Sequence, residues 1–130
     1  ARRKTFRSYY ASARPSAGEI RRLLGALKGY DSVVVSLQGM TRKVASGYGL
    51  TQESLELLAA LRAGGTPAAL VVFGNPYSLA LTGPQTAVLL AYEDDPEAQT
   101  AAAEIIAGER AASGRLPVSV SRDFPRGLGL

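Results

Sequence analysis

The sequence predicts an α/β fold, namely a doubly wound, mostly parallel open sheet with helices on both faces. Helical patterns alternate along the chain with short apolar runs, which is the order expected for a layered α/β domain. Those runs are continuous rather than alternating, as in strands that are covered on both faces. A chain of 130 residues can build one sizeable core. Residues 1–130 are therefore expected to form a single domain in an α/β sandwich.

Three helices are predicted, each with a start signal, an apolar stripe and a glycine that ends it. A Ser, Thr or Asp side chain stands at each start, where it can accept a backbone N–H. Leucines, or alanines and isoleucines, then recur at helical spacing, and a glycine follows. The helices are expected between Ser16 and Gly29, between Thr51 and Gly64, and between Asp95 and Gly108.

The strands are expected in the apolar runs between these helices. The runs are Ser32–Leu37, Ala68–Phe73 and Thr86–Tyr92. Thr5–Tyr10 is a weaker candidate, so residues 1–15 are either a basic arm or a first strand. Val118–Ser121 alternates polar and apolar side chains, which suits an edge or antiparallel strand.

Ligands of open α/β sheets bind beyond the carboxyl ends of the strands, where the loops Gln38–Leu50, Gly74–Pro84 and Glu93–Asp95 are expected. The first loop carries cations that can hold an anion or a network of sugar hydroxyls, although a solvated surface loop is the plainer interpretation. In the second loop, a Gly-Asn-Pro corner suits the start of a short crossover and leaves the tyrosine after it unexplained. The candidate binding residues on this rim are Arg42, Lys43, Tyr48, Asn75 and Tyr77.

The residue types that are missing exclude several kinds of chemistry. The chain has no Cys and no His, so it holds no zinc–thiolate site, no HExxH site and no Ser-His-Asp triad. No glycine-rich phosphate loop is present, and the acidic Glu93–Asp95 run is best explained as a helix start. We therefore expect no catalytic residue, no metal site and no cofactor.

The net charge of +4 comes from one end of the chain. Residues 1–15 hold five basic side chains and no acidic one, whereas the rest holds ten basic and eleven acidic side chains. Such an end is more often a solvated terminus than a nucleic-acid site, so no nucleic acid is expected as a partner. No apolar run is long enough to predict a membrane span, and no secretion signal opens the chain.

Four stretches together resemble the C-terminal domain of glycoside hydrolase family 3. They are DSVVVSLQGM at 31–40, VVFGNPYSLAL at 71–81, AYEDDPEAQTAAAEIIAGERAASGRLPVSVS at 91–121 and FPRGLGL at 124–130. The ordered series covers about three quarters of the chain and is most similar to the bacterial β-N-acetylhexosaminidase branch. The resemblance implies a retaining mechanism whose nucleophile lies in an N-terminal (β/α)₈ barrel outside this chain.

The leading hypothesis is therefore an accessory domain of a bacterial β-N-acetylhexosaminidase or β-glucosidase of carbohydrate metabolism. It would be inactive alone, shape the active-site rim and have the barrel as its partner. The resemblance further suggests that the chain is most of that domain, and is compatible with a periplasmic or secreted parent. A stand-alone carbohydrate- or partner-binding module is the alternative, and a flavodoxin-like flavin or nucleotide binder rests on fold analogy alone. Uncovered loops or sheet edges predict weak self-association.

Overall fold

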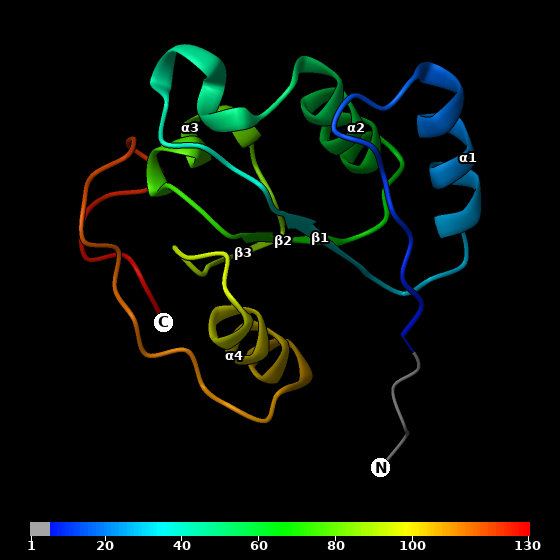
Figure 1. The fold of residues 1–130 in the computed structure, drawn as a ribbon. Helices are drawn as coiled ribbons and strands as arrows, with labels where there is room; N and C mark the ends of the chain where they lie inside the picture. The colour runs from blue at the N-terminus through cyan, green and yellow to red at the C-terminus, as the bar shows by residue number, and fades with distance from the viewer. Residues whose placement is uncertain (1–5) are drawn as a thin grey trace.

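A parallel sheet of three strands in the order β1-β2-β3 forms the centre of the protein (Figure 1). The computed structural model describes residues 6–130. The strands are β1 (Val33–Leu37), β2 (Ala68–Val72) and β3 (Ala87–Leu90). Val35 of β1 lies beside Leu70 of β2, which lies beside Val88 of β3. The predicted parallel sheet and its three main strands are thus confirmed.

The helices begin at the predicted caps. They are α1 (Ala17–Leu27), α2 (Gln52–Ala63) and α4 (Pro96–Ala107). The side chains of Ser16, Thr51 and Asp95 each accept a backbone N–H from the first turn, which satisfies donors that a helix otherwise leaves free. Short helical turns complete the chain at η1 (Val44–Gly49), η2 (Pro76–Ser78) and α3 (Leu79–Thr82).

Helices cover both faces of the sheet, as predicted. Figure 1 shows α1, α2 and α3 on one face and α4 on the other. The crossovers β1–α2–β2 and β2–α3–β3 advance across the sheet in the same direction, and right-handed crossovers of that kind keep their helices on one face. Each face has its own core: Leu58, Leu70, Val72 and Leu79 on the α2 and α3 side, and Val71, Phe73 and Ala102 on the α4 side.

The chain after α4 folds back on itself and forms no strand. The expected strand at Val118–Ser121 is wrong, because the N–H of Val120 bonds to the carbonyl of Phe124 only a few residues later. Leu116 likewise exchanges backbone bonds with Gly127 and Leu128. Val120 and Phe124 pack against the core on the α2 and α3 side. The tail therefore stays at the rim of the fold and adds no strand to the sheet.

The N-terminal segment is held by side chains and not by a sheet. Residues 6–15 have no regular secondary structure, so the weakly expected strand at Thr5–Tyr10 is absent from its described part. Instead, the N–H and hydroxyl of Ser12 donate to the carboxylate of Glu19, and the Tyr9 hydroxyl lies 3.1 Å from that of Tyr30. The segment is thus attached through contacts to α1 and to the loop after α1, and not through the backbone hydrogen bonds of a sheet.

Three of the five basic side chains of the arm, Arg2, Arg3 and Lys4, lie outside the described residues. Arg7 is exposed, and Arg14 lies 3.5 Å from Glu53.

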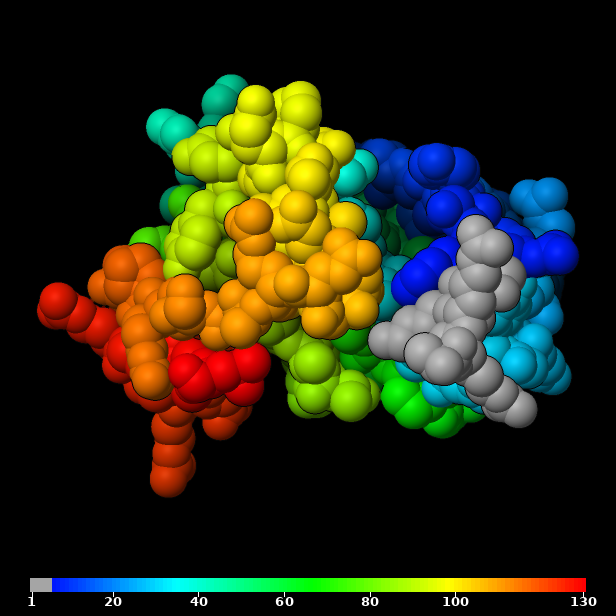
Figure 2. Space-filling view, turned by 90° about the horizontal axis from the view of Figure 1, so that it is seen from below, coloured from blue at the N-terminus to red at the C-terminus, as the bar shows by residue number. Residues whose placement is uncertain are grey.

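Seen from the α4 side in Figure 2, α4 occupies the centre of the face, between the C-terminal tail and the N-terminal segment. Over residues 6–130, no helix has the length and apolar character that crossing a membrane requires.

Candidate functional site at the carboxyl edge of the sheet

The loops that follow β1 and β3 are joined across the end of β2. The backbone N–H of Gly39 donates to Oδ2 of Asp94 at 2.9 Å. The other carboxylate oxygen, Oδ1, accepts from the side-chain amide of Gln99 at 2.9 Å. These two donors, first Gly39 and then Gln99, stabilise the carboxylate and lower the pKa of Asp94. Because β2 is the middle strand, this link bridges the carboxyl edge of the sheet.

Met40 packs against Gly74, the second residue after β2. A Cβ added to Gly74 would lie 3.0 Å from both Cβ and Sδ of Met40. A contact of this length is tighter than nine in ten real Cβ contacts, so a side chain at this position requires Met40 to shift by a few tenths of an ångström. Met40 is itself packed against the core beneath α2 and α3. Gly74 is therefore needed for close packing, in addition to the bend that the sequence suggested.

The first loop is internally braced and presents its cations outward. The N–H of Thr41 donates to the carbonyl of Tyr48 at 2.8 Å, which closes the loop at its base. Gly47 and Tyr48 both have φ of 58°, a left-handed conformation that is uncommon for a tyrosine. Arg42 and Lys43 are exposed, which a binding loop and a solvated surface loop would both show.

The Gly-Asn-Pro-Tyr corner after β2 serves the local structure. The side-chain oxygen of Asn75 accepts the N–H of Tyr77 at 2.9 Å, and its carbonyl accepts the hydroxyl of Ser78 at 2.7 Å. Pro76 then begins the η2 turn. Since its oxygen is engaged in this cap, Asn75 is at the predicted edge but has a structural task. Tyr77 remains 44% exposed and is the residue of this corner that faces solvent.

The corner continues into a short crossover that α2 braces from the side. The guanidinium of Arg62 donates to the carbonyl of Thr82 at 3.0 Å. Gly83 has φ of 70°, and an added Cβ would lie 2.9 Å from the same guanidinium. The crossover from β2 to β3 is thus short, as its sequence predicts, and Arg62 contacts it from α2.

All five predicted rim residues lie in loops of this edge, and the sequence missed two features beside them. Asp95 caps α4 as expected, by accepting the N–H of Ala98 at 2.7 Å. Its neighbour Asp94, which was grouped with it, instead holds the first loop. Tyr92 has φ of 65° and turns the chain directly after β3. A signal for Asp94 existed, because a helix needs one N-cap residue and this acidic run offers two aspartates in succession.

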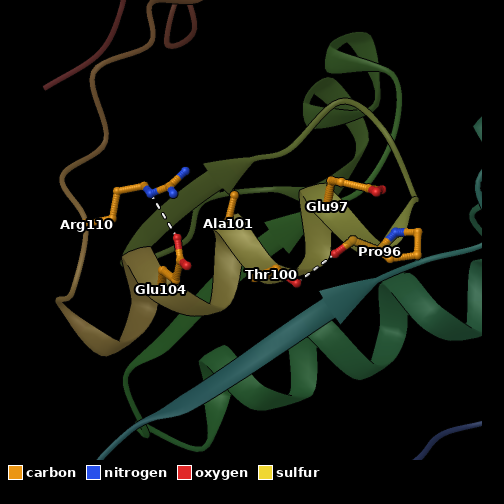
Figure 3. A pocket seen from close by; sticks show the side chains of 6 residues that line it. All are labelled: Pro96, Glu97, Thr100, Ala101, Glu104 and Arg110. Atoms are coloured by element: carbon orange, nitrogen blue, oxygen red, sulfur yellow. Dashed lines mark hydrogen bonds and ion pairs between the residues drawn. The ribbon is translucent and has the colours of Figure 1, made fainter.

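A shallow hollow of about 380 Å³ lies on the outer face of α4 (Figure 3). Its most polar feature is an ion pair, in which Nε of Arg110 is 2.9 Å from Oε2 of Glu104. Glu97, Pro96, Thr100 and Ala101 form the rest of the lining. The hollow has no aromatic side chain on which a sugar ring could stack, and its cation is already paired. Among residues 6–130, no group of three potential ligands could hold a metal ion.

Comparison with known proteins gives an informative match. Over 102 residues the chain is 34% identical to the "Periplasmic beta-glucosidase" of Salmonella typhimurium, a match that spans 75% of this chain and 13% of the relative. No protein-family model matches the chain, and no solved structure matches it. The similarity supports a relationship to glycoside hydrolase family 3, and the chain corresponds to a small part of the relative.

Proposed function

We propose that this chain is an accessory α/β domain of a bacterial family-3 glycoside hydrolase, a β-N-acetylhexosaminidase or a β-glucosidase. Its carboxyl-edge loops would form part of the active-site rim, facing a catalytic barrel supplied by the parent enzyme. The observation that carries the proposal is the match to only 13% of a periplasmic β-glucosidase. A periplasmic or secreted parent is part of the same proposal.

Of the three acids of the carboxyl edge, Asp94 and Asp95 have structural tasks, and Glu93 is exposed. A single free carboxyl group argues against catalysis by this chain alone. Retaining and inverting glycosidases use two carboxyl groups, one on each side of the bond that is cleaved. Here Asp94 binds Gly39 and Gln99, and Asp95 caps α4. Protonating or moving either group would break a contact that the fold uses. The chemistry is therefore assigned to the parent's barrel.

The remaining rim groups suit recognition of a polar ligand. Arg42 and Lys43 are exposed on one loop, and Tyr77 is exposed on the next. Cations can donate hydrogen bonds to sugar hydroxyls or to a carboxylate, and a tyrosine ring offers an apolar face with a polar tip. Tyr48 lies between these groups along the chain and is half-buried.

The test is made on the complete enzyme encoded by the parent reading frame. Replacing Arg42 and Lys43 together by Ala is expected to raise KM for a nitrophenyl glycoside roughly three- to tenfold, the range of one or two lost polar contacts. The matched control replaces Arg21 and Arg22, two exposed cations of α1, and is expected to leave KM unchanged. A reading frame without a barrel, or equal kinetics for both double variants, would contradict the proposal.

The alternative, a carbohydrate- or partner-binding module that acts alone, is favoured by the exposure of Tyr77 and of Val44, which are 44% and 72% exposed. It predicts that the isolated chain binds oligosaccharides. Titration with chito- and cello-oligosaccharides, followed by NMR, would then shift the amide signals of Gln38–Leu50 and Gly74–Pro84. An unchanged spectrum at millimolar sugar rejects this alternative and leaves the first proposal standing.

A further inference from the structure

Among residues 6–130, the loop Gln38–Leu50 has a single hydrogen-bonded link to the rest of the fold. Within residues 6–130, the bonds of Gln38–Leu50 are internal except for the one from Gly39 to Asp94. The loop also makes apolar contacts: Met40 packs against Gly74 and the core beneath α2 and α3, and Gly47 lies beside Leu81. The one hydrogen bond that attaches the loop to the rest of the described fold is therefore at Gly39, close to the start of the loop.

The contacts around Asp94 hold its carboxylate in the orientation that accepts the N–H of Gly39. The Gln99 amide, one turn into α4, donates to the second carboxylate oxygen. Asp95 takes the N-cap position, so Asp94 is not needed to cap the backbone of the helix. Just before it, the N–H of Glu93 bonds to the carbonyl of Ala91 at 2.7 Å, and Tyr92 takes its left-handed conformation. This tight turn directly precedes the carboxylate that reaches the loop of the outer strand.

We propose that Asp94 is the positioning residue of the Gln38–Leu50 loop, and that it acts as a latch between this loop and α4. Closing the latch keeps Gly39 and Met40 over the end of β2 and thereby fixes the direction in which Arg42 and Lys43 project. Opening it releases the loop while the sheet and α4 stay folded. What the positioned cations bind rests on the proposed function above; the latch itself does not.

Limited proteolysis tests the latch on the chain as it is. Trypsin cleaves after Arg42 and Lys43, inside the loop, and after Arg110, beyond α4. Asp94→Ala removes both acceptors and is expected to raise the cleavage rate within the loop roughly tenfold, as expected for loss of one charge-assisted hydrogen bond. The rate after Arg110 is expected to stay at the wild-type value, which serves as the internal control for global unfolding.

Two further variants separate positioning from charge and from capping. Asp94→Asn keeps an oxygen for Gly39 and is expected to restore most of the protection. Asp95→Asn removes the same charge but keeps a capping oxygen, and is expected to leave loop cleavage unchanged. Wild-type cleavage of the loop in Asp94→Ala, or equal acceleration after Arg110, would overturn the proposal.

The complete enzyme distinguishes a failed latch from a failed function. If the loop is a rim, Asp94→Ala raises KM more than it lowers kcat, and Asp94→Asn rescues most of the change. Faster loop cleavage without any change in KM would retain the latch and reject the rim function. Unchanged cleavage with a raised KM would do the reverse, because Asp94 would then contact substrate in its own right.

Discussion

Replacing Gly74 by Ala tests the packing of the carboxyl edge most directly. The new methyl group would lie 3.0 Å from Cβ and Sδ of Met40. The sulfur belongs to a flexible chain that can rotate away, but Cβ moves only with the backbone of the Met40 loop. Overpacking of this kind costs about 1–3 kcal/mol. For a chain of this length, roughly 3–5 °C is lost per kcal/mol, so we expect the melting temperature to fall by roughly 3–15 °C.

A double-mutant cycle shows whether Met40 is the cause. Met40→Ala alone loses packing against the core, yet it opens the space that a methyl group at position 74 would need. The double variant is therefore expected to be more stable than the sum of the single losses predicts, with a coupling energy of about 0.5–2 kcal/mol. Thermal and urea unfolding followed by circular dichroism measures each corner of the cycle. Gly74→Ala melting within a degree of the wild type, or strict additivity, would refute the reasoning.

The other predictions concern stability, acid sensitivity, association and activity. Gly25 lies inside α1 with no atom within 4 Å of an added Cβ, so Gly25→Ala is expected to stabilise the chain by about 0.5–1 kcal/mol in thermal unfolding. The pKa of Asp94 is lowered in the fold, so its contribution to stability is complete above the unfolded pKa of about 3.9 and is lost as pH falls through the folded pKa. Asp94→Asn should therefore lose less stability than the wild type on acidification below about pH 4. An identical dependence of stability on acidic pH in the two proteins would contradict this. Within residues 6–130, β1 pairs only with β2, which leaves its other edge open, and Val34 is 42% exposed. Weak self-association is therefore expected in sedimentation and should diminish in Val34→Lys. A clean monomer at millimolar protein would refute this prediction. The isolated chain is expected to hydrolyse no nitrophenyl N-acetylglucosaminide or glucoside, and turnover that persists through purification would refute it.

The features that the sequence predicted correctly are those with local causes. Caps, apolar stripes and terminal glycines lie within a few residues of the helices they delimit, so Ser16, Thr51 and Asp95 could be assigned by inspection. Continuous apolar runs identified the buried strands for the same reason. The alternating Val118–Ser121 run was misleading, because a tail that folds onto a rim also buries every second side chain, here Val120.

The contacts that organise the candidate site are not local. Gly39 and Asp94 are 55 positions apart in the chain, and nothing in either neighbourhood indicates its partner. The fit of Gly74 against Met40 likewise depends on two loops that meet only after the sheet has formed. In the sequence, the glycine could be explained by the bend at the end of a strand, and the aspartate by the helix start beside it. Each explanation was sufficient locally, so neither revealed the contact.

Most polar groups of the carboxyl edge are engaged in local structure, which limits the chemistry that this edge can perform. Asn75, Ser78 and Asp95 all direct their side-chain oxygens to backbone groups of their own loops, and Asp94 joins two loops to each other. A catalytic acid or base must instead be free to exchange a proton with substrate during each cycle. The polar side chains that this edge leaves toward solvent include Arg42, Lys43, Glu93 and Tyr77. Such groups can contact a sugar, but a single free carboxyl group is not the pair that glycosidases use to cleave a glycosidic bond. Under the proposed function, supplying a catalytic barrel should therefore give turnover, whereas adding acids to this rim should not.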